Sequence, residues 1–441
     1  MILTNATPST FTELDYGGLG VIGIDVTIDA GQANGTIVKG PGAIGGTDTL
    51  VGVNNAFNDE GLAIVGSKGD DTFNITQGTS QFSWFGIYHD GGTDQVNFTA
   101  GDGELRLRID NDSSGVNANI AGNVISSNNG EVFNLNISNV TNSFRLSIES
   151  NNGTDTLTGS INNEQFIPGA GSDTINGGGG FDSVRYNRNG VDAVDVNLET
   201  GVATGTWDGQ FFTHTLIDID RVDGSRNDGD TLTAVNSGTE GSWLDGRGGN
   251  DTLTGGLNDD TLVGGSEDDV INGGAGVDSI VAFSGNDSID GGAGSDLIFV
   301  DLNNVDTVSG GADYDALLIS NEFGGSGSFD LSGVSVASRY DGIEELNLEN
   351  GNTSDTLTLS AQNLLDFTAS ADSLLNTVFG NVLNIAGDFG DTLTLTQGSN
   401  YTFEGNDVDG EGRNLNVYSY SDGVNAAVIA VDEDVTVNQV A

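Results

Sequence analysis

Apolar residues recur along this chain at short, regular intervals that fit strands, and the 3.6-residue period of an amphipathic helix is nearly absent. From Gly246 onward the sequence divides into nine-residue lines with one large aliphatic residue at the eighth place. These residues are Leu253, Leu262, Ile271, Ile280, Ile289 and Ile298. One apolar side chain between polar neighbours predicts a short strand that points this side chain inward. Repetition at a fixed period predicts a solenoid, and two lines would make one coil.

The same lines carry aspartate at the sixth place and, in most lines, glycine at the first, second and fourth places. The sixth-place residues are Asp251, Asp260, Asp269, Asp278, Asp287 and Asp296, and after one inserted residue the series resumes at Asp306 and Asp315. A second block, residues 150–185, places Asp155, Glu164, Asp173 and Asp182 in the same way. Because glycine allows positive φ, each line predicts a tight turn followed by a strand.

Carboxylates of lines n and n+2 are separated by one full coil, so they stack on the same edge of the solenoid. Together with turn carbonyls they form an oxygen-rich environment that suits Ca²⁺. Metals that prefer imidazole or thiolate ligands are disfavoured by the same ligand set. A flexible linker rich in Gly and Asp is the alternative interpretation, and the strict spacing of both the Asp and the aliphatic residues argues against it.

This pattern resembles the RTX, or hemolysin-type calcium-binding, repeat G-G-x-G-x-D-x-U-x, in which U is aliphatic. The resemblance implies an all-β fold, a parallel β-roll or β-helix solenoid with Ca²⁺ bound in its turns. It also implies bridging pairs of carboxylates: Asp251 with Asp269, Asp260 with Asp278, Asp269 with Asp287, Asp278 with Asp296, Asp155 with Asp173, and Glu164 with Asp182. Three lines depart from the pattern, with Pro168, Arg247 and Ala282-Phe283 at glycine places.

Residues 1–149 lack full repeats but retain an echo of them, because Asp48, Asp71 and Asp94 recur at equal intervals that are longer than two nine-residue lines. This spacing predicts longer coils of a parallel β-helix. The expected strands are Leu62–Val65, Phe73–Ile75, Phe82–Ile87, Leu105–Ile109, Val132–Ile137 and Phe144–Ile148.

The same flank holds one candidate binding patch, the aromatic residues Phe82, Trp84, Phe85 and Tyr88, although packing in the core is the favoured interpretation. Three of its acidic residues are either further Ca²⁺ ligands or solvated side chains. These are Asp90, Asp94 and Asp102.

The C-terminal region, 340–441, resembles the domain that follows RTX repeats in large type I-secreted bacterial surface proteins and adhesins. The resemblance implies an uncleaved C-terminal export signal. Short helices are expected only at Ala361–Phe367 and Ser373–Val378. The expected division is an N-terminal β-solenoid (1–149), a first roll (150–185), a β-rich insertion (186–245), the main roll (246–318) and a C-terminal β-rich domain with the secretion signal (319–441).

Composition excludes several classes of function. The 441 residues include 12 Lys or Arg and 65 Asp or Glu, which gives a formal net charge of −53 at pH 7. So few basic residues exclude a nucleic-acid binder, which displaces counterions with Lys and Arg. No cysteine is present, so disulfide frameworks and thiolate metal sites are excluded. A hydrophobic fraction of 36% is too high for a disordered acidic tail.

The sequence motifs give no sign of catalysis or of a conventional leader. The chain has no H-E-x-x-H, G-x-S-x-G or G-x-x-x-x-G-K-[ST] motif. Its two histidines, His89 and His214, are interpreted as surface or packing residues. Met1–Asp15 lacks the features of a secretory signal peptide, and no apolar stretch is long enough to span a bilayer. We therefore expect a non-enzymatic protein, secreted to the exterior or surface of a bacterium by a route that does not read the N-terminus.

At this net charge a calcium-free chain repels itself, so we expect folding to depend on the Ca²⁺ found outside the cell. The leading hypothesis is a structural protein that self-assembles into a surface layer, sheath or matrix filament, because solenoids have open ends and flat faces. Its expected partners are further copies of itself, a cell-surface polysaccharide and the type I secretion machinery. A monomeric calcium-dependent adhesin is the second hypothesis. An ice-binding solenoid is the third, but its Thr-Leu-Thr triplets are scattered.

Overall fold

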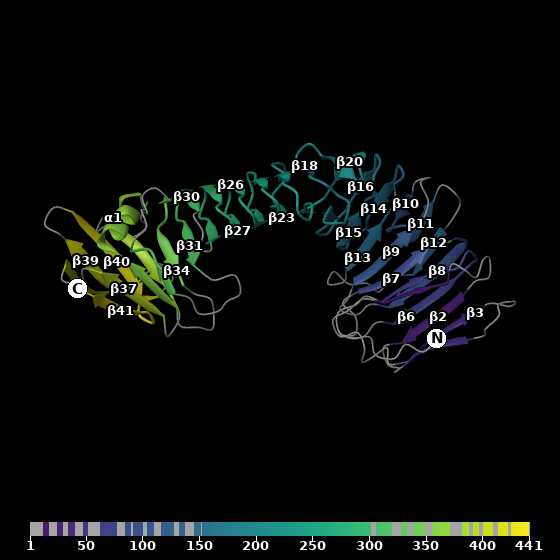
Figure 1. Cartoon of the computed structure of the whole chain (residues 1–441), viewed down its shortest axis with the longest axis horizontal. Helices are drawn as coiled ribbons and strands as arrows, with labels where there is room; N and C mark the ends of the chain where they lie inside the picture. Colours follow the sequence, from purple (N-terminus) through teal and green to yellow (C-terminus); the bar gives the residue numbers. More distant parts are fainter. Residues whose placement is uncertain are drawn as a thin grey trace. The chain divides into compact units, whose positions relative to one another are not determined.

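The computed structural model describes residues 12–16, 24–29, 34–39, 47–51, 62–76, 84–89, 91–99, 104–109, 116–127, 132–136, 145–150, 152–300, 306–319, 328–332, 336, 339–348, 355–370, 382–387, 391–396, 400–408, 413–421 and 425–440. The regular structure in these ranges is strand, mostly in long parallel sheets, with one described helix (Figure 1). The fold is therefore the predicted all-β parallel roll. Two compact units, Met1–Asp223 and Gly224–Ala441, make up the chain. The finer five-part division stays a prediction.

The first unit contains strands β1 to β21. Their bounds are β1 Thr12–Asp15, β2 Ile24–Asp29, β3 Asn34–Lys39, β4 Thr47–Val51, β5 Leu62–Val65, β6 Thr72–Thr76, β7 Trp84–His89, β8 Thr93–Thr99, β9 Glu104–Ile109, β10 Val116–Asn119, β11 Val124–Ser127, β12 Val132–Asn136, β13 Arg145–Glu149, β14 Thr156–Thr158, β15 Glu164–Ile167, β16 Thr174–Asn176, β17 Ser183–Arg185, β18 Asp195–Asn197, β19 Val202–Trp207, β20 Gln210–Ile217 and β21 Arg221–Asp223. Alternate strands join alternate sheets through most of this unit, as the coils of a solenoid require.

The first sheet of unit 1 runs β1–β5–β7–β9–β13–β15–β17–β21, and every neighbouring pair in it is parallel. In the second sheet β2, β6, β8 and β12 follow one another in parallel. Phe73 of β6 aligns with Val96 of β8, and these two residues have the same separation along the chain as Asp71 and Asp94. The predicted long coil between Asp71 and Asp94 is therefore confirmed.

The first echo of the repeat, at Asp48, does not continue this stack. Strand β4 pairs antiparallel with β3, and β3 pairs antiparallel with β2. The prediction of a parallel coil is therefore wrong for Asp48, because a hairpin replaces this coil. All six strands expected in this flank are present, with bounds shifted by at most two residues.

The change from the longer coils to the coils of two nine-residue lines occurs between β12 and β16. Strands β10, β11 and β12 are antiparallel neighbours, and β10 then pairs in parallel with β14. Leu157 of β14 aligns with Ile175 of β16, which is the predicted step of two lines. A second antiparallel excursion, β18–β19–β20, follows, and β20 returns to the stack by pairing in parallel with β16. This excursion lies within the predicted β-rich insertion.

The second unit contains strands β22 to β41 and the helix. Their bounds are β22 Thr231–Thr233, β23 Trp243–Gly248, β24 Thr252–Thr254, β25 Thr261–Ser266, β26 Val270–Ala275, β27 Ser279–Ser284, β28 Ser288–Ala293, β29 Leu297–Val300, β30 Thr307–Ala312, β31 Ala316–Ile319, β32 Ser328–Asp330, β33 Tyr340–Asp341, β34 Glu345–Asn347, β35 Thr356–Leu359, α1 Ala361–Ser370, β36 Val382–Ala386, β37 Thr392–Thr396, β38 Tyr401–Val408, β39 Asn414–Ser421, β40 Ala426–Asp432 and β41 Thr436–Val440.

The repeat region of unit 2 has the predicted coil of two lines. Leu253, Ile271 and Ile289 align on β24, β26 and β28, whereas Leu262, Ile280 and Ile298 align on β25, β27 and β29. All six side chains are buried, at 3% exposure or less. The eighth-place residues are therefore the core of the roll, and their burial is the main apolar stabilisation of each coil.

The C-terminal part of unit 2 is wider than the roll. Strands β32, β35, β37 and β41 form a separate parallel sheet, and β38, β39 and β40 form an antiparallel meander beside β36. The predicted helix at Ala361–Phe367 is confirmed as α1, which contacts β36 and β40. A capping box starts it, because Ser360 Oγ accepts the Asn363 N–H and Asn363 Oδ1 accepts the Ser360 N–H. The other expected helix, Ser373–Val378, lies outside the described residues.

Candidate metal-binding turns

The sixth-place carboxylates form ladders along the edges of the solenoid. In each step, one carboxylate oxygen accepts the backbone N–H of the sixth-place residue on the preceding coil, at N···O distances of 2.7–3.0 Å. The steps are Asp155 to Asp173, Glu164 to Asp182, Asp251 to Asp269, Asp260 to Asp278, Asp269 to Asp287, Asp278 to Asp296, Asp287 to Asp306, and Asp296 to Asp315. Every predicted bridging pair therefore lies on neighbouring coils.

The second carboxylate oxygen has a different environment. In the described part of the chain, Oδ2 is buried and has no hydrogen-bond partner in seven of the twelve predicted site residues. These are Asp182, Asp251, Asp269, Asp278, Asp287, Asp296 and Asp315. A buried oxygen without a partner is costly in a native protein unless an ion or water satisfies it. The row of orphaned oxygens is therefore the observation that fits a cation.

First-place glycines keep the space beside these oxygens open. A Cβ on Gly273 would lie 2.5 Å from Asp278 Oδ2 and 2.3 Å from the Gly291 carbonyl oxygen of the next coil. A Cβ on Gly291 would meet Asp296 Oδ2 at 2.5 Å and the Gly310 carbonyl oxygen at 2.4 Å. A carboxylate oxygen and a backbone carbonyl oxygen thus face the same small space in each turn. Such oxygen donors are the ligands that Ca²⁺ takes in proteins.

Backbone carbonyls are needed because side chains alone do not make a cage. Among the described residues there is no group of three or more His, Cys, Asp or Glu side chains that could hold a metal ion. A Ca²⁺ ion takes six to eight oxygens. Two stacked carboxylates together with turn carbonyls therefore fit this ion better than a metal that requires several side-chain ligands.

The electrostatics of the turns also favour a cation. Burial raises the pKa of Asp251 to about 8, and that of Asp269 and of Asp278 to about 7. The same cause raises the pKa of Asp287 and of Asp296 to about 6. Neighbouring carboxylates add to the increase at each of these residues. A raised pKa means that the ionised form is unfavourable, and a bound divalent cation would offset this cost.

Two departures from the glycine pattern keep the turn geometry. Arg247 and Phe283 hold second places with φ of 78° and 58°, the left-handed conformation of the glycines at equivalent places. Gly265 and Gly274, for example, have φ of 120° and 104°. A non-glycine residue in this conformation costs about 1–2 kcal/mol. The turn geometry is therefore retained at a local cost in stability.

The ladders extend beyond the residues predicted from the repeat. Asp182 N–H donates to Asp220, Asp230 N–H to Asp251, and Asp315 N–H to Glu344. Asp355 N–H donates to Asp391, 36 residues away, at 2.8 Å. Sequence reasoning missed these residues because their coils vary in length. The tripeptide Asp-Thr-Leu at 230–232, 355–357 and 391–393 was the available signal.

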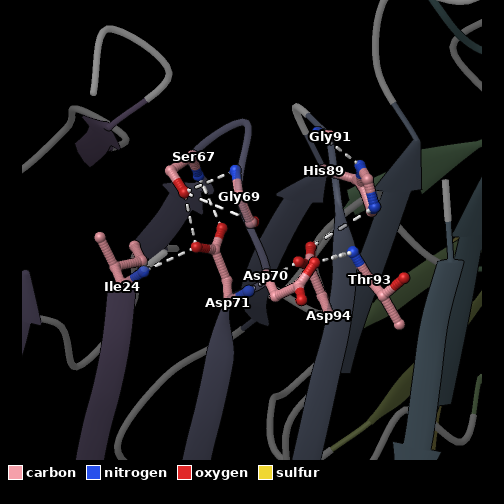
Figure 2. Close-up of polar contacts among 9 residues, drawn as sticks. All are labelled: Ile24, Ser67, Gly69, Asp70, Asp71, His89, Gly91, Thr93 and Asp94. Atoms are coloured by element: carbon pink, nitrogen blue, oxygen red, sulfur yellow. Dashed lines mark hydrogen bonds and ion pairs between the residues drawn. The ribbon is translucent and has the colours of Figure 1, made fainter. Parts of the chain in front are cut away.

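Figure 2 shows the equivalent ladder in the N-terminal flank, where the carboxylates have side-chain partners. Ile24 N–H donates to Asp71 Oδ1 at 2.7 Å, and Asp71 N–H donates to Asp94 Oδ1 at 2.9 Å. Ser67 donates to Asp71 twice, from its amide to Oδ2 at 2.6 Å and from its hydroxyl to Oδ1 at 2.7 Å. His89 Nε2 lies 3.5 Å from Asp94 Oδ2. Burial lowers the pKa of His89 to about 4, so this imidazole is neutral.

Two further predicted site residues have local partners. Ser160 donates to both oxygens of Glu164, from its amide at 2.7 Å and from its hydroxyl at 2.6 Å. His214 Nε2 lies 3.0 Å from Asp173 Oδ2. The second oxygen is therefore orphaned in one group of turns and has a neighbour in another: Ser160 at Glu164, the Gly256 N–H at Asp260 and the His214 ring at Asp173.

The remaining candidates of the N-terminal flank have separate outcomes. Phe82, Asp90 and Asp102 lie outside the described residues. Trp84 and Phe85 belong to β7, and the Tyr88 side chain is buried at 7% exposure, with the Arg108 guanidinium 5.3 Å from its ring centre. Asp94 is a buried ladder residue, so it is not a solvated side chain.

Comparison with known proteins agrees with this geometry. The family model described as RTX calcium-binding nonapeptide repeat (4 copies) matches residues 149–184, 237–271 and 263–298. No curated protein matches the chain. The chain therefore contains RTX repeats in these ranges, and such repeats bind calcium and are typical of secreted proteins. The repeat family and the all-β repeat fold favour a structural or binding role over a catalytic one. No helix in the described ranges is long and apolar enough to cross a membrane.

Proposed function

We propose that this protein is a secreted structural protein that folds when Ca²⁺ fills its turns and then self-assembles into an extracellular layer, sheath or filament. The supporting observation is the row of buried, orphaned Oδ2 atoms at the sixth places of the roll. Seven negative charges without partners oppose folding, and Ca²⁺ in the turns removes that opposition. The ligands proposed for it are the sixth-place carboxylates together with carbonyl oxygens of the glycine turns.

Calcium then acts as a folding switch. A ligand that binds only the folded state stabilises it by RT ln(1+[L]/Kd) per site, about 1.4 kcal/mol when its concentration is ten times Kd. Extracellular modules bind Ca²⁺ with Kd of about 10⁻⁴–10⁻³ M, which leaves their sites empty at cytosolic concentrations. Several such sites together equal a typical whole-domain stability of about 5–15 kcal/mol. The proposed C-terminal export signal fits this switch, because an unfolded chain passes through a narrow exporter.

The uneven charge of the chain supports self-assembly. Unit 1 has eight Lys or Arg and 28 Asp or Glu, whereas unit 2 has four and 37. Leu107, Val184 and Val222 of the first sheet point into the core, so the alternate residues of β9, β17 and β21 point outward. Five arginines lie on or beside this outer face: Arg106, Arg108, Arg185, Arg188 and Arg221.

Four of these arginines contact carboxylates of the same face. Arg108 and Arg188 both contact Glu149, and the Arg188 contact is an ion pair of 2.5 Å. Arg185 and Arg221 both contact Asp223, at 3.2 and 2.7 Å. The face therefore concentrates half of the arginines of a strongly acidic protein, on or beside strands that also carry Glu104, Glu149 and Asp223. An acidic surface of a second copy complements it, which is the contact that we propose for assembly.

Two measurements on the full chain test the proposal. Circular dichroism should show the β content of the roll only with excess Ca²⁺, on top of the β content of the N-terminal coils, and the same total β content in chelator would contradict the folding switch. Electron microscopy should then show polymers with Ca²⁺ and none without it. Replacing Arg108 and Arg188 with Gln should weaken the polymers while the β content is retained.

A monomeric calcium-dependent adhesin is the second candidate. The same arginine face favours it, because guanidinium groups also bind the carboxylates of an acidic cell-surface polysaccharide. Calcium-loaded protein that stays monomeric in sedimentation, and binds such a polysaccharide, would support this candidate over the structural one.

A further inference from the structure

The two histidines of the chain occupy corresponding places in two separate ladders. One ladder of unit 1 runs from Ile24 through Asp71 to Asp94, and another runs from Val116 through Asp155 to Asp173. Asp94 aligns next with Phe133 on β12, so no carboxylate continues the first ladder. His89 faces this final carboxylate (Figure 2). His214 faces Asp173, the final carboxylate of the second ladder.

His214 stands where the next ladder carboxylate would be. Thr174 of β16 aligns with Thr215 of β20, which places His214 in register with Asp173. The imidazole is fully buried, and its Nδ1 lies 3.0 Å from the Tyr186 hydroxyl. It stacks on Phe212 with 4.4 Å between ring centroids. Because a carboxylate only accepts hydrogen bonds, the N–H of this ring belongs on Nε2, toward Asp173, and Nδ1 accepts from Tyr186.

His89 has an equivalent arrangement with other neighbours. Its Nδ1 accepts the Gly91 N–H at 2.9 Å, which leaves the ring N–H on Nε2, 3.5 Å from Asp94 Oδ2, and the backbone of Gly92 and Val132 also interacts with this ring. His89 is also the first-place residue of the Asp94 line, and its side chain is fully buried. The position that glycine keeps open in the roll is therefore taken by a residue with a ring.

The Asp173 line also lacks the open position, because Pro168 is its first-place residue. In the turns with an orphaned Oδ2, the first place is glycine in six lines and Ala282 in the seventh. Both carboxylates that lie beside a histidine therefore lack a first-place glycine, which the Asp155 and Asp287 lines lack as well, with Ser150 and Ala282. The Asp94 and Asp173 lines belong to coils of different length and share this combination.

We propose that His89 and His214 cap the carboxylate ladders in place of calcium, so that Asp94 and Asp173 bind no metal ion. This inference rests on the proposed calcium role of the other turns. On the following coil, Phe133 and His214 are in register with Asp94 and Asp173, so no carboxylate there completes an oxygen cage. An imidazole N–H faces the second oxygen of each carboxylate without any ion from outside. The prediction from the resemblance, that Asp155 and Asp173 bridge a calcium ion, is then replaced by a calcium-independent closure.

Calcium stoichiometry of the full chain, measured by native mass spectrometry, tests the assignment. Asp173→Asn should leave the number of bound Ca²⁺ ions unchanged, and loss of an ion would overturn the proposal. Asp278→Asn is the matched control from an open turn, and it should lose at least one ion. If the control also loses none, the calcium role proposed for the roll fails, and the histidine caps are judged by the next measurement.

Hydrogen exchange in chelator tests the caps without reference to calcium. The amides of β16 should stay protected in the wild type and in His214→Gln, whose side-chain N–H replaces the imidazole N–H. His214→Ala should lose at least tenfold of this protection, both in chelator and in saturating Ca²⁺. Full protection of His214→Ala in Ca²⁺ would show that metal closes this turn, and it would overturn the proposal.

Discussion

The roll of unit 2 and the N-terminal coils of unit 1 contain the same kind of carboxylate ladder. They differ in the environment of the second carboxylate oxygen. In both regions a carboxylate accepts the N–H of the preceding coil, for example Asp269 from Asp251 and Asp94 from Asp71. In the roll, Asp269 Oδ2 is orphaned beside a glycine, whereas Ser67 and His89 face the carboxylates of the N-terminal coils.

The difference shows that the ladder and the metal site are separable. The ladder needs only a carboxylate in register with a backbone N–H, so it tolerates coils of 18, 23 or 36 residues. The proposed metal site also needs a small residue, glycine or Ala282, at the first place and no side-chain partner for the second oxygen. On this proposal, calcium dependence is a property of individual turns rather than of the whole solenoid.

The largest expected effect on stability is the difference between replacing a buried ladder carboxylate and replacing an exposed one. Asp278→Asn should lower the stability of the calcium-loaded protein by about 2–3 kcal/mol, because the binding of one or two ions is weakened. Asp290→Asn removes the same charge from an exposed strand position and should change stability by less than about 0.5 kcal/mol. Thermal unfolding with excess Ca²⁺ measures both.

In chelator, the effect of Asp278→Asn on stability should have the opposite sign. Without a cation, Asp278 is a buried carboxylate whose charge is uncompensated, so Asp278→Asn should stabilise the calcium-free chain. Destabilisation of equal size with and without Ca²⁺ would mean that Asp278 acts through its hydrogen bond alone.

A methyl group in the open space of the turn should have the next largest effect. Gly273→Ala places Cβ against Asp278 Oδ2 and the Gly291 carbonyl, which should cost about 1–3 kcal/mol and weaken calcium affinity. Gly179→Ala is the control, because its nearest neighbour would be the Ile161 Cα at 3.9 Å. Calcium titration followed by circular dichroism compares the two variants, and equal affinities would argue against the glycine-lined site.

Acidification should stabilise the calcium-free roll. Asp251, Asp269 and Asp278 have folded pKa values of about 7–8, above the value of about 3.9 in an unfolded chain. The folded state binds protons more tightly than the unfolded state. The free-energy cost of burying these ionised carboxylates is therefore complete above about pH 8 and disappears as the pH falls toward about 4. The midpoint of thermal unfolding in chelator should rise by at least about 5 °C between pH 8 and pH 5.

With saturating Ca²⁺ the dependence should be opposite, because protons compete with the ion for the same carboxylates. Stability of the loaded protein should fall as the pH decreases from 8 to 5. If stability changed with pH in the same direction with Ca²⁺ and in chelator, these carboxylates would not be the metal ligands.

Relief of backbone strain should have the smallest effect. Phe283 has φ of 58° and its side chain is 42% exposed, so Phe283→Gly removes strain of about 1–2 kcal/mol and loses little packing. Glycine costs about 0.5–1 kcal/mol in unfolded-state entropy, so the net gain should be about 0.5–1 kcal/mol. Lower stability of this variant in thermal unfolding would show that the aromatic side chain has a packing role.

Strict periodicity made the roll predictable. The nine-residue line gave the coil, the buried aliphatic positions and the stacked carboxylates, including Asp306 and Asp315 after the inserted residue. Glycine at fixed places also indicated the turn geometry, which Arg247 and Phe283 adopt despite their side chains. Local sequence was sufficient here because every contact repeats at a constant separation.

The histidine contacts could not be predicted in the same way. His214 meets Asp173 only because the excursion β18–β19–β20 leaves the stack and then returns in register with β16. The interpretation of His214 as a surface or packing residue left its burial open and missed its polar contact. Asp48 was misplaced for the converse reason, since a hairpin interrupts a spacing that the sequence alone presents as regular.

Hydrogen exchange of the full chain in excess Ca²⁺ and in chelator tests the central claim most directly, because it resolves the two regions in one experiment. Chelator should remove protection from the strands of 251–315, where most sixth-place carboxylates have an orphaned oxygen, and should leave the strands of 62–97 protected. Equal loss of protection in both regions, or retained protection in 251–315 without calcium, would contradict this claim.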